Sequence, residues 1–250
     1  MAIFSLENVS FAYAGYRPSL VDISLAISSG ERVALLGANG SGKSTVLHLL
    51  NGLYFAQSGQ VRAFGTVLTE LALDTAPFGP EFRRRVGFIF QNSDAQLFCP
   101  NVVEELEFGP LQLGLAKDEI RARVEDTLNL LGISALRDRA PQTLSAGQKR
   151  LVAVASALTM APSVLLLDEP TAGLDARSQG RLLDVLDGMS ERGVTLVSTT
   201  HDLTILTQMA TRSIVLSEDH RIIFDGTSET VLNDEALLTQ ANLMFRRPER

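Results

Sequence analysis

A glycine-rich loop between an apolar run and a helical pattern constrains the fold of this chain more than any other feature. The run Val33–Leu36 is short and continuously apolar, which is typical of a strand covered on both faces. The loop Gly37–Ser44 reads Gly-Ala-Asn-Gly-Ser-Gly-Lys-Ser, and a helix is expected from Lys43 to about Asn51. A strand, a glycine-rich turn and a helix N-terminus in this order predict a phosphate-binding loop.

Each part of this loop has a chemical use in holding a phosphate chain. The glycines let successive backbone N–H groups turn inward, and the helix N-terminus adds positive potential. Lys43 is expected to reach the β- and γ-phosphates, and the Ser44 hydroxyl to ligate Mg²⁺. The expected phosphate-binding residues are Gly37, Asn39, Gly40, Ser41, Gly42, Lys43, Ser44 and Thr45.

A second apolar run, Val164–Leu167, leads directly into two carboxylates, Asp168 and Glu169. At the edge of a sheet, Asp168 could hold Mg²⁺ directly or through water. Glu169 is one residue further on and points elsewhere, so it could orient or deprotonate an attacking water. Taken without the loop, the pair could equally be the acidic turn that often ends a strand.

Strand and helix patterns alternate along the chain. Alternating apolar positions at Phe4 and Leu6, and from Ile23 to Ile27, predict early antiparallel strands. Apolar runs at Val194–Val197 and Ile214–Leu216 are separated by helical stretches. The pattern predicts an α/β fold: a P-loop NTPase core with a mostly parallel sheet, an N-terminal antiparallel β subdomain and an α-helical insertion.

The insertion is expected over residues 92–150. Between Val102 and Gly132 the pattern is helical, Gly132 is the expected stop, and one stripe is apolar: Ile120, Val124, Leu128 and Leu131. Residues 221–226 predict an edge strand closed by an Asp-Gly turn. The expected organisation is one domain over 1–250, with a core of 1–91 and 151–230, a helical subdomain of 92–150, and a C-terminal helix with a basic tail over 231–250.

Composition and charge limit the compartment and the partners. A single cysteine, Cys99, excludes an intrachain disulfide and fits a reducing compartment. A formal net charge of −7 predicts no general footprint for nucleic acid and repulsion from bare anionic lipid. The start of the chain has no signal-peptide pattern. The uncharged stretch Leu151–Leu167 contains Pro162, which favours a buried helix, a turn and a buried strand over a membrane span.

Arg83–Arg85 is expected at a solvated strand entrance, with contact to lipid headgroups or a partner as the alternative. Because the charge balance disfavours direct lipid binding, any membrane role is expected to run through a protein partner.

Two further segments, Leu144–Gln148 (Leu-Ser-Ala-Gly-Gln) and Leu167–Asp175 (Leu-Asp-Glu-Pro-Thr-Ala-Gly-Leu-Asp), complete the set of motifs. Together with the phosphate loop they resemble the nucleotide-binding subunit of an ATP-binding cassette (ABC) ATPase, over residues 2 to about 230. The resemblance implies an active ATPase that uses ATP and Mg²⁺. It also implies a sandwich with a second ABC ATPase subunit, identical or paralogous, whose signature closes over the ATP on this chain's loop. Ser145 and Gly147 begin a helix whose free N–H groups suit such a contact.

Other family positions carry over one by one. Tyr13 matches the aromatic residue that stacks on adenine; Tyr16 is a substitute, and a packed surface tyrosine is the alternative. Gln91, after the strand expected at 86–90, matches the glutamine that senses Mg²⁺ and the γ-phosphate. The resemblance implies that Glu169, His201 and Gln91 are catalytic, that Ser44, Gln91 and Asp168 bind the metal, and that Ser145, Gly147, Gln148 and Asp175 contact the nucleotide or couple the two sites.

The signature departs from the family at Ala146, where a glycine is usual. If the backbone there has positive φ, the added Cβ costs on the order of 1 kcal/mol, whereas in helical or extended geometry it costs almost nothing.

The segment Gln91–Pro110 resembles the ATPase subunits of energy-coupling-factor importers, in particular the cobalt/nickel group. The vitamin-importing branch is similar but typically lacks the Leu-Phe-x-Pro and Phe-Gly-Pro pieces. The resemblance implies a peripheral location on the cytoplasmic side of the cell membrane, with a transmembrane coupling subunit and a substrate-binding membrane subunit as partners and no nucleic acid. A vitamin-type or other ABC transporter is the alternative, and a soluble ABC ATPase is disfavoured because no sustained heptads occur after Gln91.

In that family this segment helps to form a groove for the coupling helices of the transmembrane partner. Its apolar wall is expected from Leu97, Phe98, Val102, Val103 and Leu106. The alternative is that these side chains pack against the insertion's own helices.

Overall fold

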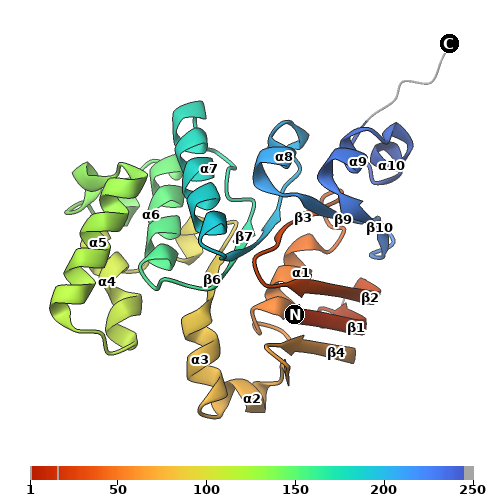
Figure 1. Ribbon diagram of the computed structural model, residues 1–250, viewed down its shortest axis with the longest axis horizontal. Coiled ribbons are helices and arrows are strands. Elements are labelled where there is room, and N and C mark those ends of the chain that lie inside the picture. The colour runs from red at the N-terminus through yellow and green to blue at the C-terminus, as the bar shows by residue number, and fades with distance from the viewer. Residues whose placement is uncertain (1, 16, 245–250) are drawn as a thin grey trace. The chain divides into compact units, whose positions relative to one another are not determined.

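The computed structural model describes residues 2–15 and 17–244 and divides into two compact units (Figure 1). The first unit contains the chain up to Pro80 and from Thr195 onward, and the second is Glu81–Val194. The limits expected above for the helical subdomain, 92–150, stay a prediction.

The first unit contains most of the strands. Its elements are β1 (Ala2–Ala12), β2 (Pro18–Ser28), β3 (Arg32–Leu36), α1 (Lys43–Leu50), β4 (Ser58–Ala63), β5 (Thr66–Val67), α2 (Glu70–Asp74), β8 (Thr195–Thr199), η4 (Leu203–Ile205), α8 (Leu206–Met209), β9 (Arg212–Leu216), β10 (Ile222–Thr227), α9 (Ser228–Leu232) and α10 (Glu235–Gln240).

The second unit contains most of the long helices. The helix α3 (Phe78–Arg85) enters it, followed by β6 (Val86–Ile89), η1 (Ser93–Ala95), α4 (Val102–Gln112), α5 (Lys117–Leu131), η2 (Ser134–Leu136), η3 (Pro141–Thr143), α6 (Ala146–Leu158), β7 (Val164–Asp168) and α7 (Ala176–Glu191).

The early strands form an antiparallel sheet, as predicted. Its order is β2-β1-β4-β5, and Leu6 of β1 lies opposite Leu25 of β2 and Val61 of β4. All three of these side chains are buried, because alternate residues of a strand point to one face.

The remaining strands are mostly parallel, which confirms the predicted α/β fold. In the first unit β3 pairs in parallel with β8 and β9, and β10 lies antiparallel to β9 at the edge. In the second unit β6 pairs in parallel with β7, from Val86 opposite Val164 to Ile89 opposite Leu167. The run Val33–Leu36 is completely buried, as expected of a strand covered on both faces.

The predicted Asp-Gly turn is wrong. Asp225 and Gly226 lie inside β10, opposite Ile214 and Ser213 of β9. The Asp225 carboxylate accepts two hydrogen bonds of 2.7 Å from the Arg212 guanidinium, so it acts as a cross-strand partner and not as a turn residue. The chain reverses earlier, at residues 217–221.

The helical pattern predicted between Val102 and Gly132 is two helices, α4 and α5. They are separated at Gly114, which has a φ of 71°. Gly132, with a φ of 63°, ends α5 as predicted. The apolar stripe of α5 is buried, and the segment around Pro162 does connect a buried helix, α6, to a buried strand, β7.

Arg83–Arg85 lies directly before β6, with Arg83 and Arg84 exposed, as expected of a solvated strand entrance. The same residues form the last turn of α3, a helix that was not predicted, where positive charge suits the helix C-terminus. Tyr16 and the basic tail Arg246–Arg250 lie outside the described residues.

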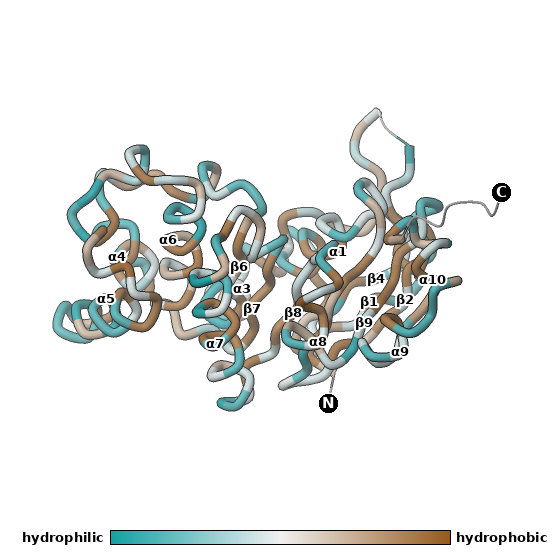
Figure 2. Tube along the Cα trace, turned by 90° about the horizontal axis from the view of Figure 1, so that it is seen from above, coloured by the Kyte–Doolittle hydropathy of each residue, from teal (hydrophilic) through white to brown (hydrophobic). Residues whose placement is uncertain are grey.

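Hydrophobic residues recur along β1 and β2 of the first unit (Figure 2), and their inward side chains are buried. One core cluster joins Ala34 and Leu36 of β3 to Val215 of β9 and to the last helices, which contribute Leu206, Ala210, Val231, Leu237, Leu238 and Ala241. This packing fixes β3, and with it the point where the glycine-rich loop begins. Among the described residues, no helix has the length and apolarity required to cross a membrane.

Two leucines of α4 provide a matched test of this packing. Leu106 is fully buried and Leu111 is 51% exposed. Leu106→Asp should lower the free energy of unfolding by about 3 kcal/mol or more, because it leaves a carboxylate uncompensated in the core. Leu111→Asp should change it by about 0.5 kcal/mol or less. Urea unfolding of the isolated protein measures both, and equal losses would contradict the burial assigned to α4.

Candidate functional site

The loop after β3 requires glycine at particular positions. Gly37 has a φ of 143° and Gly42 a φ of 107°, in the region that side chains with a Cβ rarely adopt. A Cβ on Gly37 would lie 2.5 Å from the Leu216 carbonyl oxygen, and one on Gly42 would lie 2.4 Å from the Ser19 carbonyl oxygen. The loop is therefore packed closely against the backbone of its neighbours.

The ammonium group of Lys43 lies inside this loop. Its Nζ donates hydrogen bonds of 2.9 Å to the carbonyl oxygens of Gly37 and Ala38, and the residue is 6% exposed. The buried Ser41 Oγ has no hydrogen-bond partner among the described residues. A buried hydroxyl without a partner is costly, so an oxygen-rich anion beside Lys43 would satisfy it. The loop thus fits the phosphate group that the sequence assigns to it.

Tyr13 lies beside the start of α1. Its hydroxyl is 3.2 Å from Thr45 Oγ1, and its half-buried ring packs edge-to-face on Phe11 and Tyr54, with centroids 5.0 and 5.2 Å apart. Next to it is an open pocket of about 570 Å³ whose lining residues are Tyr13, Arg17, Pro18, Ser19 and His220. Because Ser19 also abuts Gly42, this pocket adjoins the phosphate loop, as a site for a base would.

His201 follows β8 by one residue and is exposed. Since β8 runs parallel to β3, the carboxyl ends of both strands lie at the same sheet edge. The structure therefore brings His201 and the start of the glycine-rich loop to one edge of the first unit.

In the second unit, parallel pairing of β6 and β7 brings their carboxyl ends together. Asp168, the last residue of β7, is 4% exposed, and Glu169 follows it with a φ of 47°. Gln91 Nε2 donates a hydrogen bond of 3.3 Å to Glu169 Oε2. Positive φ at a glutamate is unfavourable by about 1 kcal/mol or more, and strain of this kind is common at functional sites.

Arg150 completes this edge and was not predicted from the sequence. It is 5% exposed, and its guanidinium donates to the carbonyl oxygens of Phe90, at 2.6 Å, and Gln91. Burial lowers the pKa of Arg150 below its ordinary value, and the charges of Asp168 and Glu169 act in the opposite direction. An arginine at the border of an otherwise uncharged stretch was the only signal in the sequence.

The signature helix α6 begins as predicted. Ser145 is its N-cap: its Oγ accepts from the Gln148 N–H at 3.3 Å, and its N–H donates to Gln148 Oε1 at 3.0 Å. This capping box satisfies two backbone N–H groups at the start of α6, where Ser145 is exposed to solvent. Ala146 is helical and does not have positive φ, so its Cβ carries almost no cost.

Asp175 caps α7, because its carboxylate accepts a hydrogen bond of 2.8 Å from the Ser178 N–H. This backbone hydrogen bond lowers the pKa of Asp175 below its ordinary value. The coupling role of Asp175 and the nucleotide contacts of Ser145, Gly147 and Gln148 stay predictions.

The expected apolar wall is only partly at the surface. Leu97 is 8% exposed, and Val102 and Leu106 are fully buried on α4, which packs against α5 and α6. Phe98 and Phe108 are 62% and 42% exposed, and their rings meet edge-to-face at 4.9 Å. With the exposed Leu111 they form what we call the Phe98 surface. Val103 is half-buried.

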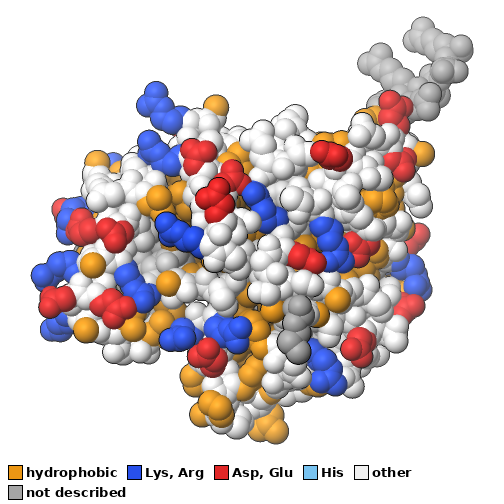
Figure 3. Space-filling model, in the orientation of Figure 1, with side chains coloured by type: hydrophobic (Ala, Val, Ile, Leu, Met, Phe, Trp, Pro, Cys, Tyr) orange, Lys and Arg blue, Asp and Glu red, His pale blue; other side chains and the backbone are white. Residues whose placement is uncertain are grey.

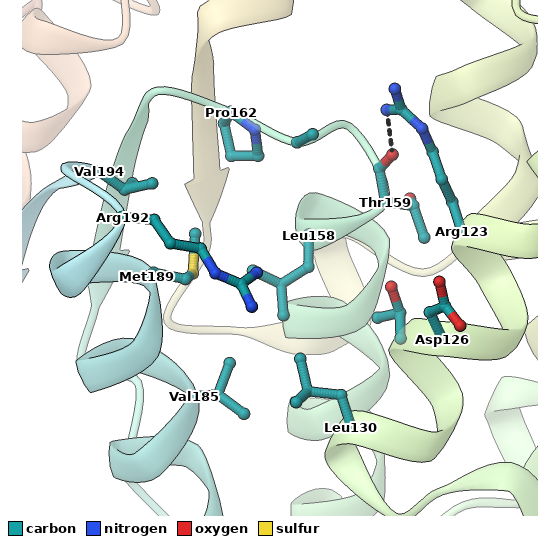
Figure 4. Close-up of a pocket in the computed structure, with 12 residues that line it drawn as sticks. Arg123, Asp126, Leu130, Leu158, Thr159, Pro162, Val185, Met189, Arg192 and Val194 are labelled. Atoms are coloured by element: carbon teal, nitrogen blue, oxygen red, sulfur yellow. Dashed lines mark hydrogen bonds between the residues drawn. The ribbon is translucent and has the colours of Figure 1, made fainter.

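A separate pocket of about 540 Å³ lies between α5, the end of α6 and α7 (Figure 4). Its walls include Leu158, Val185 and Met189; Arg192 extends across it, and Arg123 donates to the Thr159 carbonyl oxygen at 3.1 Å. None of the predicted site residues lines it. The candidate nucleotide-binding residues therefore lie outside this pocket.

On the face seen in Figure 3, acidic and basic side chains of the described residues are interspersed.

Substitutions at two glycines of the loop distinguish the cost of backbone strain from the cost of steric contact. At Gly40, where φ is 84°, a Cβ would meet nothing within 4 Å, whereas at Gly42 it would meet backbone. Gly40→Ala should lower the free energy of unfolding by roughly 1 kcal/mol, from positive φ alone. Gly42→Ala should lower the free energy of unfolding by a larger amount, because its Cβ would also collide with the Ser19 carbonyl oxygen. Thermal or urea unfolding tests this order, and a smaller loss for Gly42→Ala would contradict the loop's packing.

Comparison with known proteins gives consistent results. Residues 20–172 match the family described as ABC transporter. The chain is 46% identical to the nickel import ATP-binding protein NikO of Rhodobacter capsulatus, covering 96% of this chain and 95% of that protein. It is also 46% identical to the cobalt import ATP-binding protein CbiO of the same organism, covering 96% and 84%. The structure of CbiO1 from Clostridium perfringens, part of the transporter complex CbiONQ, matches with a TM-score of 0.80 and 34% identity over 97% of this chain and 95% of that one.

Proposed function

Because the chain belongs to the ABC transporter family, we propose that it is the ATP-hydrolysing subunit of a membrane importer of nickel or cobalt ions. As an ATP-binding protein of that family it binds and hydrolyses ATP. The observation that carries the proposal is the Gly37–Ser44 loop, which holds the buried Lys43 ammonium and a Ser41 hydroxyl that has no hydrogen-bond partner among the described residues. A bound oxyanion would interact with both groups. The metal cargo is supported by the names of the two 46% identical relatives.

Binding would use groups of the first unit. The loop's backbone N–H groups and Lys43 hold the phosphates, and Ser41 Oγ donates to a phosphate oxygen. Tyr13 lies beside a pocket that adjoins the loop, so its ring supports the adenine.

Ser44, Gln91 and Asp168 would hold Mg²⁺. Among the described residues no cluster of three or more His, Cys, Asp or Glu side chains could bind a metal alone, which fits an ion held by a hydroxyl, an amide, one carboxylate and phosphate oxygens. When bound, the ion neutralises charge on the β- and γ-phosphate oxygens.

Hydrolysis would use the carboxyl edge of the second unit. The Gln91 amide orients the Glu169 carboxylate, which accepts a proton from water as the water oxygen attacks the γ-phosphorus. The bond from that phosphorus to the β–γ bridging oxygen breaks in the same reaction. His201 would contact the γ-phosphate from the edge of β8.

A second ABC ATPase subunit completes the proposed site. The start of α6, where Ser145 is exposed and Gly147 is half-buried, would present the Ser145 side chain and the Gly147 N–H to the ATP of that second subunit. Closure of two such subunits buries each nucleotide between a loop and a signature.

The Phe98 surface is the proposed docking site for a coupling helix of a transmembrane subunit. Exposed aromatic side chains suit an amphipathic helix, and buried Glu105 fixes the loop by accepting from the N–H groups of Phe98 and Cys99 at 2.9 and 2.8 Å. The chain would then be peripheral to the cell membrane on its cytoplasmic side, held there by protein partners.

Uptake of radiolabelled nickel and cobalt tests the cargo. Cells carrying the full transporter with wild-type chain should accumulate at least one of these ions, and Lys43→Ala should abolish that uptake because the loop loses its ammonium. If uptake of both ions is unchanged while the variant stays membrane-bound, the cargo is a vitamin or another solute.

Charge substitutions on the Phe98 surface test docking. Phe98→Glu and Phe108→Glu should weaken retention of the chain on its transmembrane partner at least tenfold, because they place charge in an apolar contact. Leu130→Glu, at a leucine of α5 that is 55% exposed and outside this surface, is the control. Co-purification with the complex is the measurement. Equal retention of all three variants, each folded, would move the docking site elsewhere.

A further inference from the structure

One face of the signature helix α6 is joined to the segment Phe90–Gln96 by a set of polar contacts. Gln96 Nε2 donates to the Ala153 carbonyl oxygen at 2.9 Å and to Ser156 Oγ at 3.2 Å, while Gln96 Oε1 accepts from the Phe90 N–H at 3.2 Å. Arg150 lies one turn before Ala153 on the same face. Helix α6 therefore contacts the segment Phe90–Gln96 at both ends of the segment.

Arg150 makes the innermost of these contacts. Its two terminal nitrogens donate to the carbonyl oxygens of Phe90 and Gln91, and the residue is 5% exposed. The guanidinium also lies within the electrostatic influence of Asp168 and Glu169. The planar fork of arginine makes two such bonds at fixed geometry, which a lysine cannot reproduce.

A buried cation of this kind is a poor means of stabilising a fold. Desolvation opposes the attraction between buried charges, so apolar residues of similar volume are often as stable or more so. What the arrangement does provide is a fixed position for the Gln91 main chain. The Gln91 side chain in turn donates to Glu169 Oε2 at 3.3 Å.

We propose that Arg150 is a positioning residue for ATP hydrolysis: from helix α6 it fixes Gln91, and through the Gln91 amide it sets the Glu169 carboxylate. The proposal rests on the function proposed above, in which Glu169 receives a proton from the attacking water. In this proposal Arg150 acts only through Gln91 and is assigned no contact of its own with nucleotide or water.

The position of Arg150 on α6 gives this arrangement a further consequence. Only about 7.5 Å of helix separates Ser145 from Arg150, at 1.5 Å per residue. If the proposed contact between the signature and the nucleotide of the second subunit displaced the start of α6, Arg150 would carry that displacement to the main chain of Gln91.

A double-mutant cycle on the purified transporter complex tests this assignment. Arg150→Met should lower the kcat of ATP hydrolysis roughly tenfold to a hundredfold, because small displacements of reacting groups cost that much. The Kd for ATP should stay within about twofold, since the proposal gives Arg150 no part in holding the nucleotide. In a Gln91→Ala background, the same substitution should lower kcat less than about threefold, because the residue it acts through is gone.

The neighbouring Lys149→Met is the matched control. Lys149 joins α6 to the same segment through an ion pair of 2.5 Å with Asp94, but not to Gln91. The Asp94 carboxylate is mostly exposed and such pairs contribute little, so kcat should remain near the wild-type value. If Arg150→Met does not fold, Arg150→Lys keeps the charge without the fork and enters the same cycle, with a smaller loss expected.

Additive losses in the cycle, or an unchanged kcat in folded Arg150→Met, would overturn the positioning role. A wild-type complex that hydrolyses no ATP would instead overturn the proposed function. The two failures are therefore distinguishable in one set of assays.

Discussion

The buried ammonium group of Lys43 is the interaction on which the rest of this structure depends. It lies inside a loop with three positive-φ glycines, two of which pack closely against neighbouring backbone, and it donates to two carbonyl oxygens of that loop. Holding a cation in that place requires a strand, β3, that is fixed by packing on both faces, and a helix, α1, whose first residue is the lysine itself. The ATPase chemistry of the family starts from this preorganised charge, because phosphate binding is mainly electrostatic positioning.

Parallel strand pairing explains how residues far apart in sequence reach the same edge. Gln91 and Glu169 follow β6 and β7, and a hydrogen bond joins them in the second unit. His201 and the glycine-rich loop follow β8 and β3 in the first unit. In both units the carboxyl ends of parallel strands collect the reactive side chains, which is the general rule for α/β proteins. Helix α6 adds a connection of its own, because Arg150 and Gln96 attach it to the segment that carries Gln91.

Sequence patterns predicted what depends on local periodicity and missed what depends on tertiary contacts. The parallel strands, the antiparallel strands β1 and β2 and the stop at Gly132 were predicted, because each has a local signature in apolar spacing or a glycine. The start of α6 was predicted from the family resemblance, whereas its capping box and the strands β4 and β5 were not predicted. The Asp225-Gly226 turn was wrong because Arg212 on the adjacent strand engages Asp225. Leu97, Val102 and Leu106 were expected at the surface but are buried, since apolar side chains give the same pattern whether a partner or the core covers them. Arg150 was missed for a related reason: its partners are backbone carbonyls, which no sequence pattern marks.

The most direct test of the central claim, that these residues hydrolyse ATP through a carboxylate base, is the turnover of Glu169→Gln. The amide keeps the shape of the side chain but cannot accept the proton, so turnover should fall about a hundredfold or more while ATP still binds. The protein should then accumulate as an ATP-bound closed dimer, seen as a doubled mass in light scattering. Exposed Glu104→Gln, on the same protein, should hydrolyse ATP normally. Undiminished turnover in Glu169→Gln would contradict this account and remove Glu169 from the base role.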